Sequence, residues 1–256
     1  MKNGHTTRQK APAGRYALLD ELRGLDLVSM MLYHACWDMM FLFGIWMDWY
    51  AGIPGRLWQQ AICWVFILLS GFCAPFGRHM LRRGVTVFAA GALVTAVTLV
   101  FMPGNRVIFG VLTFLGTAML LTGVLEPLLK KVMPAVGLAV SAVLFAVCYP
   151  VGSGWVGLGG WKQMLPQSLY ASYFTAFFGF YPDWFYSADY FGLLPWLFLF
   201  WAGYYLHKAV GRRRMEPLRR PVCPALGWMG RHSLLLYLLH QPVIYGVLSA
   251  AAVLFA

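Results

Sequence analysis

Runs of apolar residues close to the length of a membrane-spanning helix recur along this chain and constrain its fold more than any other feature. A helix needs about 20 such residues to cross the roughly 30 Å of hydrocarbon in a bilayer. Charged residues make up 11% of the chain, whereas soluble domains carry about 25%, so lipid has to cover much of its surface. We therefore predict an all-α integral membrane protein, a single bundle of about seven transmembrane helices. The predicted spans are residues 25–46, 58–77, 85–102, 108–126, 133–150, 191–209 and 232–253.

The distribution of lysine and arginine predicts how the spans are oriented. Cytoplasmic loops of membrane proteins are enriched in these residues. If the N-terminus is cytoplasmic, all but three of the 20 lysines and arginines fall on the cytoplasmic side, the exceptions being Arg56, Arg106 and Lys162. The sequence thus predicts a multi-pass protein of the cell's inner (plasma) membrane, with residues 1–18 as a basic cytoplasmic tail and residues 19–256 as the transmembrane domain.

The positive charge of the chain argues for a membrane partner. A net charge of +11 would suggest a nucleic-acid partner in a soluble protein. Here the basic residues gather between apolar runs, which indicates membrane topology and contact with anionic lipid instead, and we expect no nucleic-acid partner. No two of the five cysteines form a C-x-x-C pair, and no cysteine–histidine spacing matches a zinc site. We therefore expect no metal and no disulfide.

One long connection, about residues 151–190, is predicted on the extracytoplasmic side and is rich in aromatic residues. Such a segment is typical of an interfacial aromatic belt or of a short helix lying on the membrane. Long loops in compact domains are also often functional, which favours a lid or a sugar-stacking floor over an outward-facing pocket. The sequence leaves both interpretations open.

Ionisable groups in the first span are the strongest sign of a functional site. Asp26, His34 and Asp38 lie in this apolar stretch, where such groups are rare and usually face a cavity, a partner or a substrate path. His34 and Asp38 are four residues apart and so share a helix face. Asp26 precedes His34 by about two turns and lies on roughly the same stripe. A carboxylate near an imidazole can orient it and raise its basicity. The alternative is that His34 is a structural residue, hydrogen-bonded to another helix.

The last span carries a second polar group. His240 and Gln241 precede Pro242, which frees a backbone carbonyl and commonly lines a cavity in membrane helices. Counted from the cytoplasmic ends of their spans, His240 and His34 lie at a similar depth. The two imidazoles can therefore converge in one cavity. A packing role is the alternative for His240.

Several motifs resemble those of a known group of membrane enzymes. The opening L-D-E-L-R-G, residues 19–24, followed by Met30 and His34, resembles the start of the transmembrane acyltransferases. Further stretches resemble the branch related to heparan-α-glucosaminide N-acetyltransferase and extend the resemblance over about residues 15–245. These stretches are F-I-L-L-S-G at 66–71, I-F-G-V-L at 108–112, L-L-P-W at 193–196, W-M-G-R-H-S-L at 228–234 and Y-L-L-H-Q-P at 237–242.

The resemblance implies an activity as well as a membrane fold. Enzymes of this group take an acyl group, usually acetyl from acetyl-CoA, on the cytoplasmic side and deliver it to a sugar hydroxyl or amine on the other side. The acceptor would then be an extracytoplasmic sugar or glycolipid. His34 matches the intramembrane histidine that the wider group uses in catalysis, and Asp20 and Arg23 match its membrane-surface motif.

From these residues we predict a catalytic set and a donor-binding set. His34 would be general base or transient acyl carrier, with Asp38 orienting it. His240 would be a second proton carrier or an acceptor-positioning residue. Basic residues at the cytoplasmic ends of the first and last spans would face the phosphates of the acyl-CoA donor. These are Arg23, Arg231 and His232, and the predicted polar set also includes Asp20, Asp26 and Gln241.

Two departures from the family pattern leave other functions open. The active-site histidine of the lysosomal enzyme lies between its first two spans, and the matching residues here, about 47–60, contain no histidine. Bacterial relatives often have a histidine where this chain has Thr113. The alternatives are a transporter or flippase of a small anion or lipid-linked sugar, with the polar stripe as a proton relay, and a catalytically idle scaffold. The sequence also leaves open whether the chain forms a homodimer.

Overall fold

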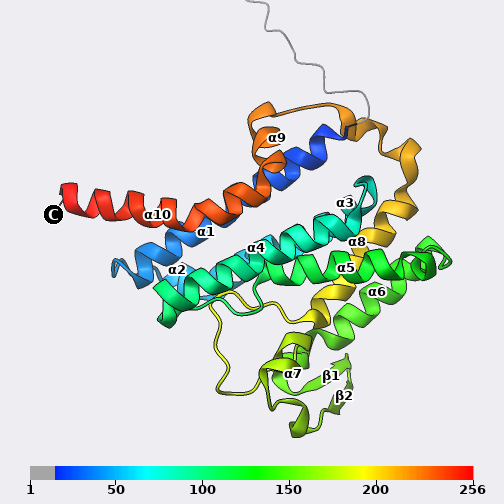
Figure 1. Ribbon diagram of the computed structural model, residues 1–256, viewed down its shortest axis with the longest axis horizontal. Helices are drawn as coiled ribbons and strands as arrows, with labels where there is room; N and C mark the ends of the chain where they lie inside the picture. The colour runs from blue at the N-terminus through cyan, green and yellow to red at the C-terminus, as the bar shows by residue number, and fades with distance from the viewer. Residues whose placement is uncertain (1–14, 256) are drawn as a thin grey trace, which may run out of the picture. The chain divides into compact units, whose positions relative to one another are not determined.

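The computed structural model describes residues 15–255 of the chain (Figure 1). These residues form two compact units, and each is described by itself. The first unit contains the described residues up to Asp48 together with those from Val210 onward, and the second contains Trp49–Ala209. Both units are built mainly from helices, as expected for a helical membrane protein. Most of the predicted cytoplasmic tail lies outside the described residues.

Two long helices that run in the same direction form the first unit. Its elements are α1 (Ala17–Phe41), η5 (Glu216–Arg219), α9 (Pro224–Arg231) and α10 (Ser233–Phe255). Both α9 and α10 pack against α1 (Figure 1). His34 of α1 contacts His240 of α10, and Phe43, which follows the end of α1, contacts Tyr245 farther along α10. The two helices are therefore parallel, with their N-terminal ends on the same side.

The first helix is longer at its start than the apolar run predicts. We expect a span from residue 25, but α1 begins at Ala17 and ends at Phe41. The L-D-E-L-R-G motif forms helix because it contains no helix breaker before its final glycine, and Asp20 lies in the first turn, where negative charge interacts well with the helix dipole. The helix ends before Gly44, whose φ of 70° is a left-handed conformation typical of chain reversal after a helix.

Two glycines bring the backbones of α1 and α9 into contact. A Cβ atom on Gly24 would overlap the carbonyl oxygen of Leu226, and a Cβ on Gly230 would overlap the carbonyl oxygen of Asp20. Any other residue at either position would force the helices apart. The glycines of the L-D-E-L-R-G and W-M-G-R-H-S motifs thus serve one interface, and small residues are used in the same way at other helix contacts in membranes.

Five long helices dominate the second unit. Its helices of more than four residues are α3 (Ile53–Cys73), α4 (Met80–Phe101), α5 (Val111–Leu129), α6 (Pro134–Cys148), η3 (Tyr149–Ser153), α7 (Tyr173–Phe178) and α8 (Leu193–Arg214). The short α2 (Asp48–Ala51) precedes them. Glycines again set the closest contacts, since a Cβ on Gly116 of α5 would lie 2.5 Å from the backbone nitrogen of Phe88 on α4. A Cβ on Gly71 of α3 would overlap the carbonyl oxygen of Phe200 on α8.

Five helices of the described chain are long and apolar enough to cross a membrane. These candidate spans are Ile53–Phe76, Met80–Phe101, Val111–Leu129, Pro134–Ser153 and Ser233–Leu254. They correspond to five of the predicted spans. The remaining two predicted spans coincide with α1 and α8, which are helices of 25 and 22 residues. Both carry more polar and charged residues than the other five, so their crossing of the membrane stays a prediction.

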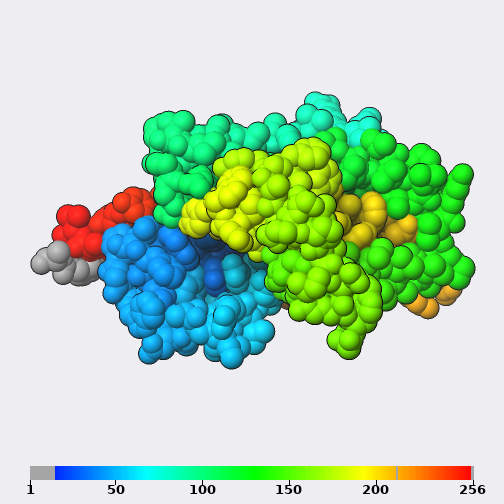
Figure 2. Space-filling view, turned by 90° about the horizontal axis from the view of Figure 1, so that it is seen from below, coloured from blue at the N-terminus to red at the C-terminus, as the bar shows by residue number. Residues whose placement is uncertain are grey.

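The aromatic segment at about 151–190 is folded rather than extended. It contains the one β-hairpin of the described chain, β1 (Trp155–Leu158) paired antiparallel with β2 (Trp161–Met164), and the short helix α7. The hairpin is an exception to the predicted all-α fold. In the space-filling view, the yellow-green atoms of this segment form a continuous surface (Figure 2). The hydroxyl groups of Tyr170 and Tyr190 donate hydrogen bonds to backbone carbonyls, and burial raises the pKa of both. They stay neutral donors at physiological pH.

The end of this segment binds the start of α5. The backbone nitrogen of Ile108 donates to Ser187 Oγ at 2.9 Å, and that of Val111 donates to Asp189 Oδ2 at 3.0 Å. The Asp189 carboxylate therefore satisfies one of the free N–H groups at the helix N-terminus. Phe109 has a φ of 55°, a left-handed backbone conformation that turns the chain just before α5 begins. The I-F-G-V-L motif thus has a structural role that spacing alone does not reveal.

Candidate active site

The structure brings the two predicted intramembrane histidines together. The ring centroids of His34 on α1 and His240 on α10 are 4.8 Å apart, and the ring planes are inclined by 58°. His34 lies 17 residues after the start of α1, whereas His240 lies seven residues after the start of α10. The two rings meet because α9 lies beside the first turns of α1, so that α10 begins alongside a later part of that helix. Two imidazoles at this separation can exchange a proton directly or through one bridging group.

Asp38 joins the same cluster through the facing helix. Its carboxylate is completely buried, with 0% relative exposure. Gln241 Nε2 donates a hydrogen bond to Asp38 Oδ1 at 2.7 Å. We expect Asp38 to orient His34, but the hydrogen bond found for its side chain links it to Gln241. This bond fixes the rotation of α10 against α1 and places His240, the preceding residue, beside His34.

The tautomer of His240 follows from its hydrogen bond. Its Nδ1 atom faces the backbone carbonyl oxygen of Tyr237, one turn earlier on α10. A carbonyl oxygen can only accept, so Nδ1 carries the hydrogen and Nε2 of the neutral ring presents a lone pair. His240 is 7% exposed. The ring is therefore held as a buried base whose free nitrogen points away from its own helix backbone.

Asp26 is buried but does not join the histidines. Its relative exposure is 7%. At about 100° per residue, eight positions place Asp26 about 80° around α1 from His34, whereas Asp38 is about 40° away. At 1.5 Å per residue, Asp26 also lies about 12 Å along α1 from His34, too far to contact the imidazole pair. Its place on one stripe with His34 and Asp38 stays a prediction.

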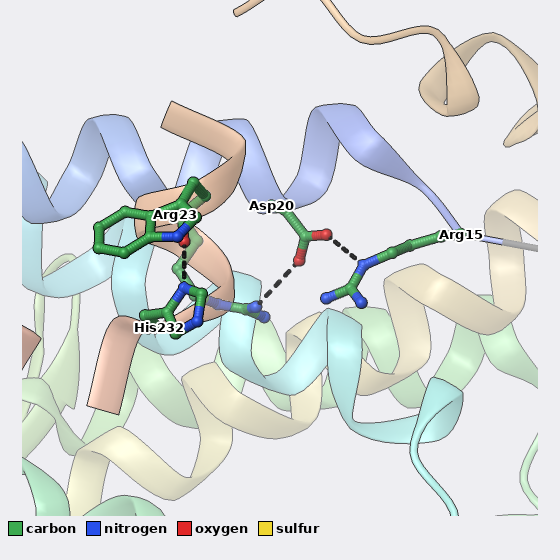
Figure 3. Close-up of polar contacts among 5 residues, drawn as sticks. Arg15, Asp20, Arg23 and His232 are labelled. Carbon is green, nitrogen blue, oxygen red and sulfur yellow. Dashed lines mark hydrogen bonds and ion pairs between the residues drawn. The ribbon is translucent and has the colours of Figure 1, made fainter. Parts of the chain in front are cut away.

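A second polar cluster surrounds the start of α1, as Figure 3 shows. Asp20 accepts from Arg15 Nε at 2.6 Å and lies 3.6 Å from Arg23 NH1. Asp20 is 7% exposed, so its charge has to be balanced by these guanidinium groups. The aspartate of the L-D-E-L-R-G motif thus holds two arginines at this end of the helix.

The other predicted donor-binding residues lie at the same end of the first unit. Contact between Gly230 and Asp20 places Arg231 and His232 next to the start of α1, and both side chains are exposed. His232 Nδ1 is 2.9 Å from the carbonyl oxygen of Trp228, and the two rings lie 4.5 Å apart. Exposed basic groups in this position can meet a phosphorylated ligand.

Glu21 is a structural residue that sequence reasoning missed. Its two carboxylate oxygens accept from the backbone nitrogen of Val222 at 2.9 and 3.0 Å, and the residue is 4% exposed. This bond ties the chain before α9 to α1. The one signal in the sequence is that residues 20 and 21 are both acidic. Lysine and arginine orient a membrane span and acids contribute little, so a second acid beside the motif aspartate suggests a structural role.

Replacing Glu21 with alanine is expected to lower the free energy of unfolding by about 1–3 kcal/mol, because the buried acceptor of the Val222 N–H is lost. The corresponding fall in Tm is about 2–12 °C at about 2–4 °C per kcal/mol. Thermal unfolding in detergent measures it. Glu216 is the matched control: it is exposed and pairs with Arg219, so Glu216→Ala should cost less than about 1 kcal/mol. Equal effects of the two substitutions would contradict this role of Glu21.

A family comparison agrees with this geometry. The catalytic-domain family of heparan-alpha-glucosaminide N-acetyltransferase matches residues 15–242. The chain belongs to this family. The matched region starts at Arg15 and ends at Pro242, so it includes both polar clusters, and the predicted resemblance is confirmed. No curated protein and no solved structure matches the chain. Membership places the chain in a family of membrane acetyltransferases.

Proposed function

We propose that this protein is a membrane-embedded acetyltransferase that moves an acetyl group from cytosolic acetyl-CoA to a hydroxyl or amine of an extracytoplasmic sugar or glycolipid. The observation that carries the proposal is the pairing of His34 with His240 on helices whose N-terminal ends carry the basic cluster. Asp20 precedes His34 by 14 residues, which is about 21 Å of helix. The basic residues that would bind the donor and the imidazoles that would react are thus separated along α1 and α10.

In this proposal the two clusters have different tasks. Arg23, Arg231 and His232 bind phosphates of the donor on the cytoplasmic side. The long arm of coenzyme A then carries the thioester along α1 toward the imidazoles. The imidazole pair of His34 and His240 moves the proton of the reaction there, and a well-placed imidazole typically contributes about 10²- to 10⁴-fold to the rate.

The directions of α1 and α10 support the seven-span topology. Two parallel helices that both cross a membrane need an odd number of crossings between them. The four candidate spans from Ile53 to Ser153 are one too few, and α8 supplies the fifth. With the N-terminus in the cytoplasm, α1 and α10 then both run outward, and the aromatic segment lies outside.

Cysteine labelling tests this topology. In a cysteine-free background, Lys162→Cys is expected to react with a membrane-impermeant maleimide in intact cells, because the position lies in the extracytoplasmic hairpin. Arg213→Cys, at the end of α8, should react only after permeabilisation, and it serves as the internal control. Labelling of position 213 in intact cells would mean that α8 does not cross as proposed.

Transfer is tested with the purified full chain in liposomes. Acetyl-CoA labelled in the acetyl group is supplied together with glucosamine, which offers both an amine and hydroxyls, and the labelled product is analysed for N- or O-acetylation. Label is expected on the sugar. Uptake of sugar or anion without acetylation would favour the transporter or flippase instead, and absence of acetyl-CoA binding by calorimetry would favour an idle scaffold.

A further inference from the structure

Three buried polar atoms of the intramembrane cluster have no hydrogen-bond partner among residues 15–255. They are Asp38 Oδ2, Gln241 Oε1 and His240 Nε2. Such atoms are rare in folded proteins, and each costs about 1–3 kcal/mol when it stays unsatisfied. Packing alone would not favour three of them at one helix contact. A set of this kind indicates a place where a ligand supplies the missing bonds.

Two of these atoms are acceptors whatever the charge of Asp38. The oxygen of the Gln241 amide has no hydrogen, because its nitrogen is the donor to Asp38. His240 Nε2 presents a lone pair because Nδ1 holds the ring hydrogen against Tyr237. The ligand atoms that meet this set must therefore carry hydrogens.

This requirement separates the two substrates of an acetyl transfer. The thioester carbonyl and the phosphates of acetyl-CoA are themselves acceptors, so they gain nothing from this set. Gln241 Oε1 and His240 Nε2 also offer no donor for the oxyanion that forms on the thioester carbonyl. Hydroxyl and amine groups of a sugar donate hydrogen bonds and fit it. We infer that Asp38, Gln241 and His240 hold the acceptor substrate, an inference that rests on the proposed acetyltransferase function and gives His240 the proton of the attacking group.

The transfer then balances as follows. The acceptor hydroxyl or amine gives its proton to His240 Nε2 while its oxygen or nitrogen bonds to the thioester carbon. The carbon–sulfur bond breaks, and coenzyme A leaves as a thiolate. The proton passes from the His240 imidazolium, by way of His34 at 4.8 Å between ring centroids, to that sulfur. The products are the acetylated sugar and coenzyme A thiol. Asp38 and Gln241 are positioning residues, because they hold neighbouring donors of the sugar.

The test uses one substitution and its swap. Asp38→Asn replaces an acceptor with a donor and is expected to raise the KM for glucosamine at least about tenfold, with the KM for acetyl-CoA changed less than about twofold. The double variant D38N/Q241E exchanges carboxylate and amide between the helices, so the new asparagine can donate to the new glutamate and leave two acceptors again. This double variant is expected to bring the KM for glucosamine most of the way back to its wild-type value. Saturation-transfer NMR of glucosamine on both proteins in detergent measures binding independently of turnover.

Two results would overturn the inference. One is an increase in the KM for acetyl-CoA, rather than for glucosamine, in Asp38→Asn. The other is a folded swap variant that binds glucosamine no better than Asp38→Asn, because a purely structural pair would regain its stability without regaining affinity. Thermal unfolding of each variant identifies the folded ones. Failure of the proposed function has a different readout: wild-type protein would move no label from acetyl-CoA. The NMR comparison would in that case still decide where glucosamine binds.

Discussion

Replacing His34 with alanine is expected to lower the rate of acetyl transfer by about 10²- to 10⁴-fold, the usual contribution of a positioned imidazole. His34 is in ring contact with His240 and passes the proton onward from it, so the substitution interrupts the proton transfer. Binding of acetyl-CoA should change little, because the basic cluster lies at the far end of the helix pair. The measurements are single-turnover transfer of labelled acetyl groups and calorimetry with acetyl-CoA on the same purified protein.

His79 is the matched control for this prediction. It is exposed, it precedes α4 in the second unit, and its φ of 59° is left-handed, a conformation that asparagine tolerates. His79→Asn should therefore retain the full transfer rate. If His34→Ala transfers acetyl groups as fast as His79→Asn while remaining folded, the catalytic assignment of His34 is wrong.

Alanine at Gly24 or Gly230 is expected to destabilise the protein more than any other single substitution considered. Each new Cβ would overlap a backbone carbonyl oxygen of the facing segment, and backbone cannot move aside as a side chain can. Overpacking of this kind typically costs about 1–3 kcal/mol and occasionally more. At about 2–4 °C per kcal/mol, a cost of 1–3 kcal/mol lowers Tm by about 2–12 °C, and a larger cost lowers it further. Thermal unfolding in detergent, followed by loss of monodisperse protein, measures the effect.

Gly246 shows what the same change does in open space. It lies within α10, and nothing is within 4 Å of a Cβ built on it. Gly246→Ala should be neutral or stabilising by up to about 1 kcal/mol, because alanine is the better helix former. A Gly24→Ala protein that unfolds at the same temperature as Gly246→Ala would show that α1 and α9 are not in backbone contact.

Hydrophobicity predicts which segments are helices and says less about where they begin. The apolar runs locate α3 to α6 and α10, because lipid-facing surface must be apolar along the whole crossing. The run at 25–46 misses the first turns of α1, since a charged motif can be helical as well as an apolar one. Depth counting from residues 25 and 232 predicts that His34 and His240 can meet. They do meet although α1 begins eight residues earlier, because α9 lies beside those first turns and α10 starts farther along α1.

Other parts of the site depend on contacts that no local pattern encodes. The bond between Asp38 and Gln241 requires a particular rotation of α10, which a helical period alone does not fix. The roles of Gly24 and Gly230 become clear only when their motifs, distant in sequence, face one another. Glu21 and Asp189 both accept backbone N–H groups of segments remote in the chain, and acids with such partners look in sequence like ordinary surface charges.

The parallel pair of α1 and α10 has a consequence for biosynthesis. One half of the buried cluster is made by the first 41 residues of the chain, and the other half belongs to its final helix. If α1 crosses the bilayer as proposed, Asp38 enters it long before the ribosome has produced the Gln241 amide that will donate to it. A nascent chain released before α10 would leave this side chain in lipid without its partner, so we expect truncations that remove α10 to be degraded.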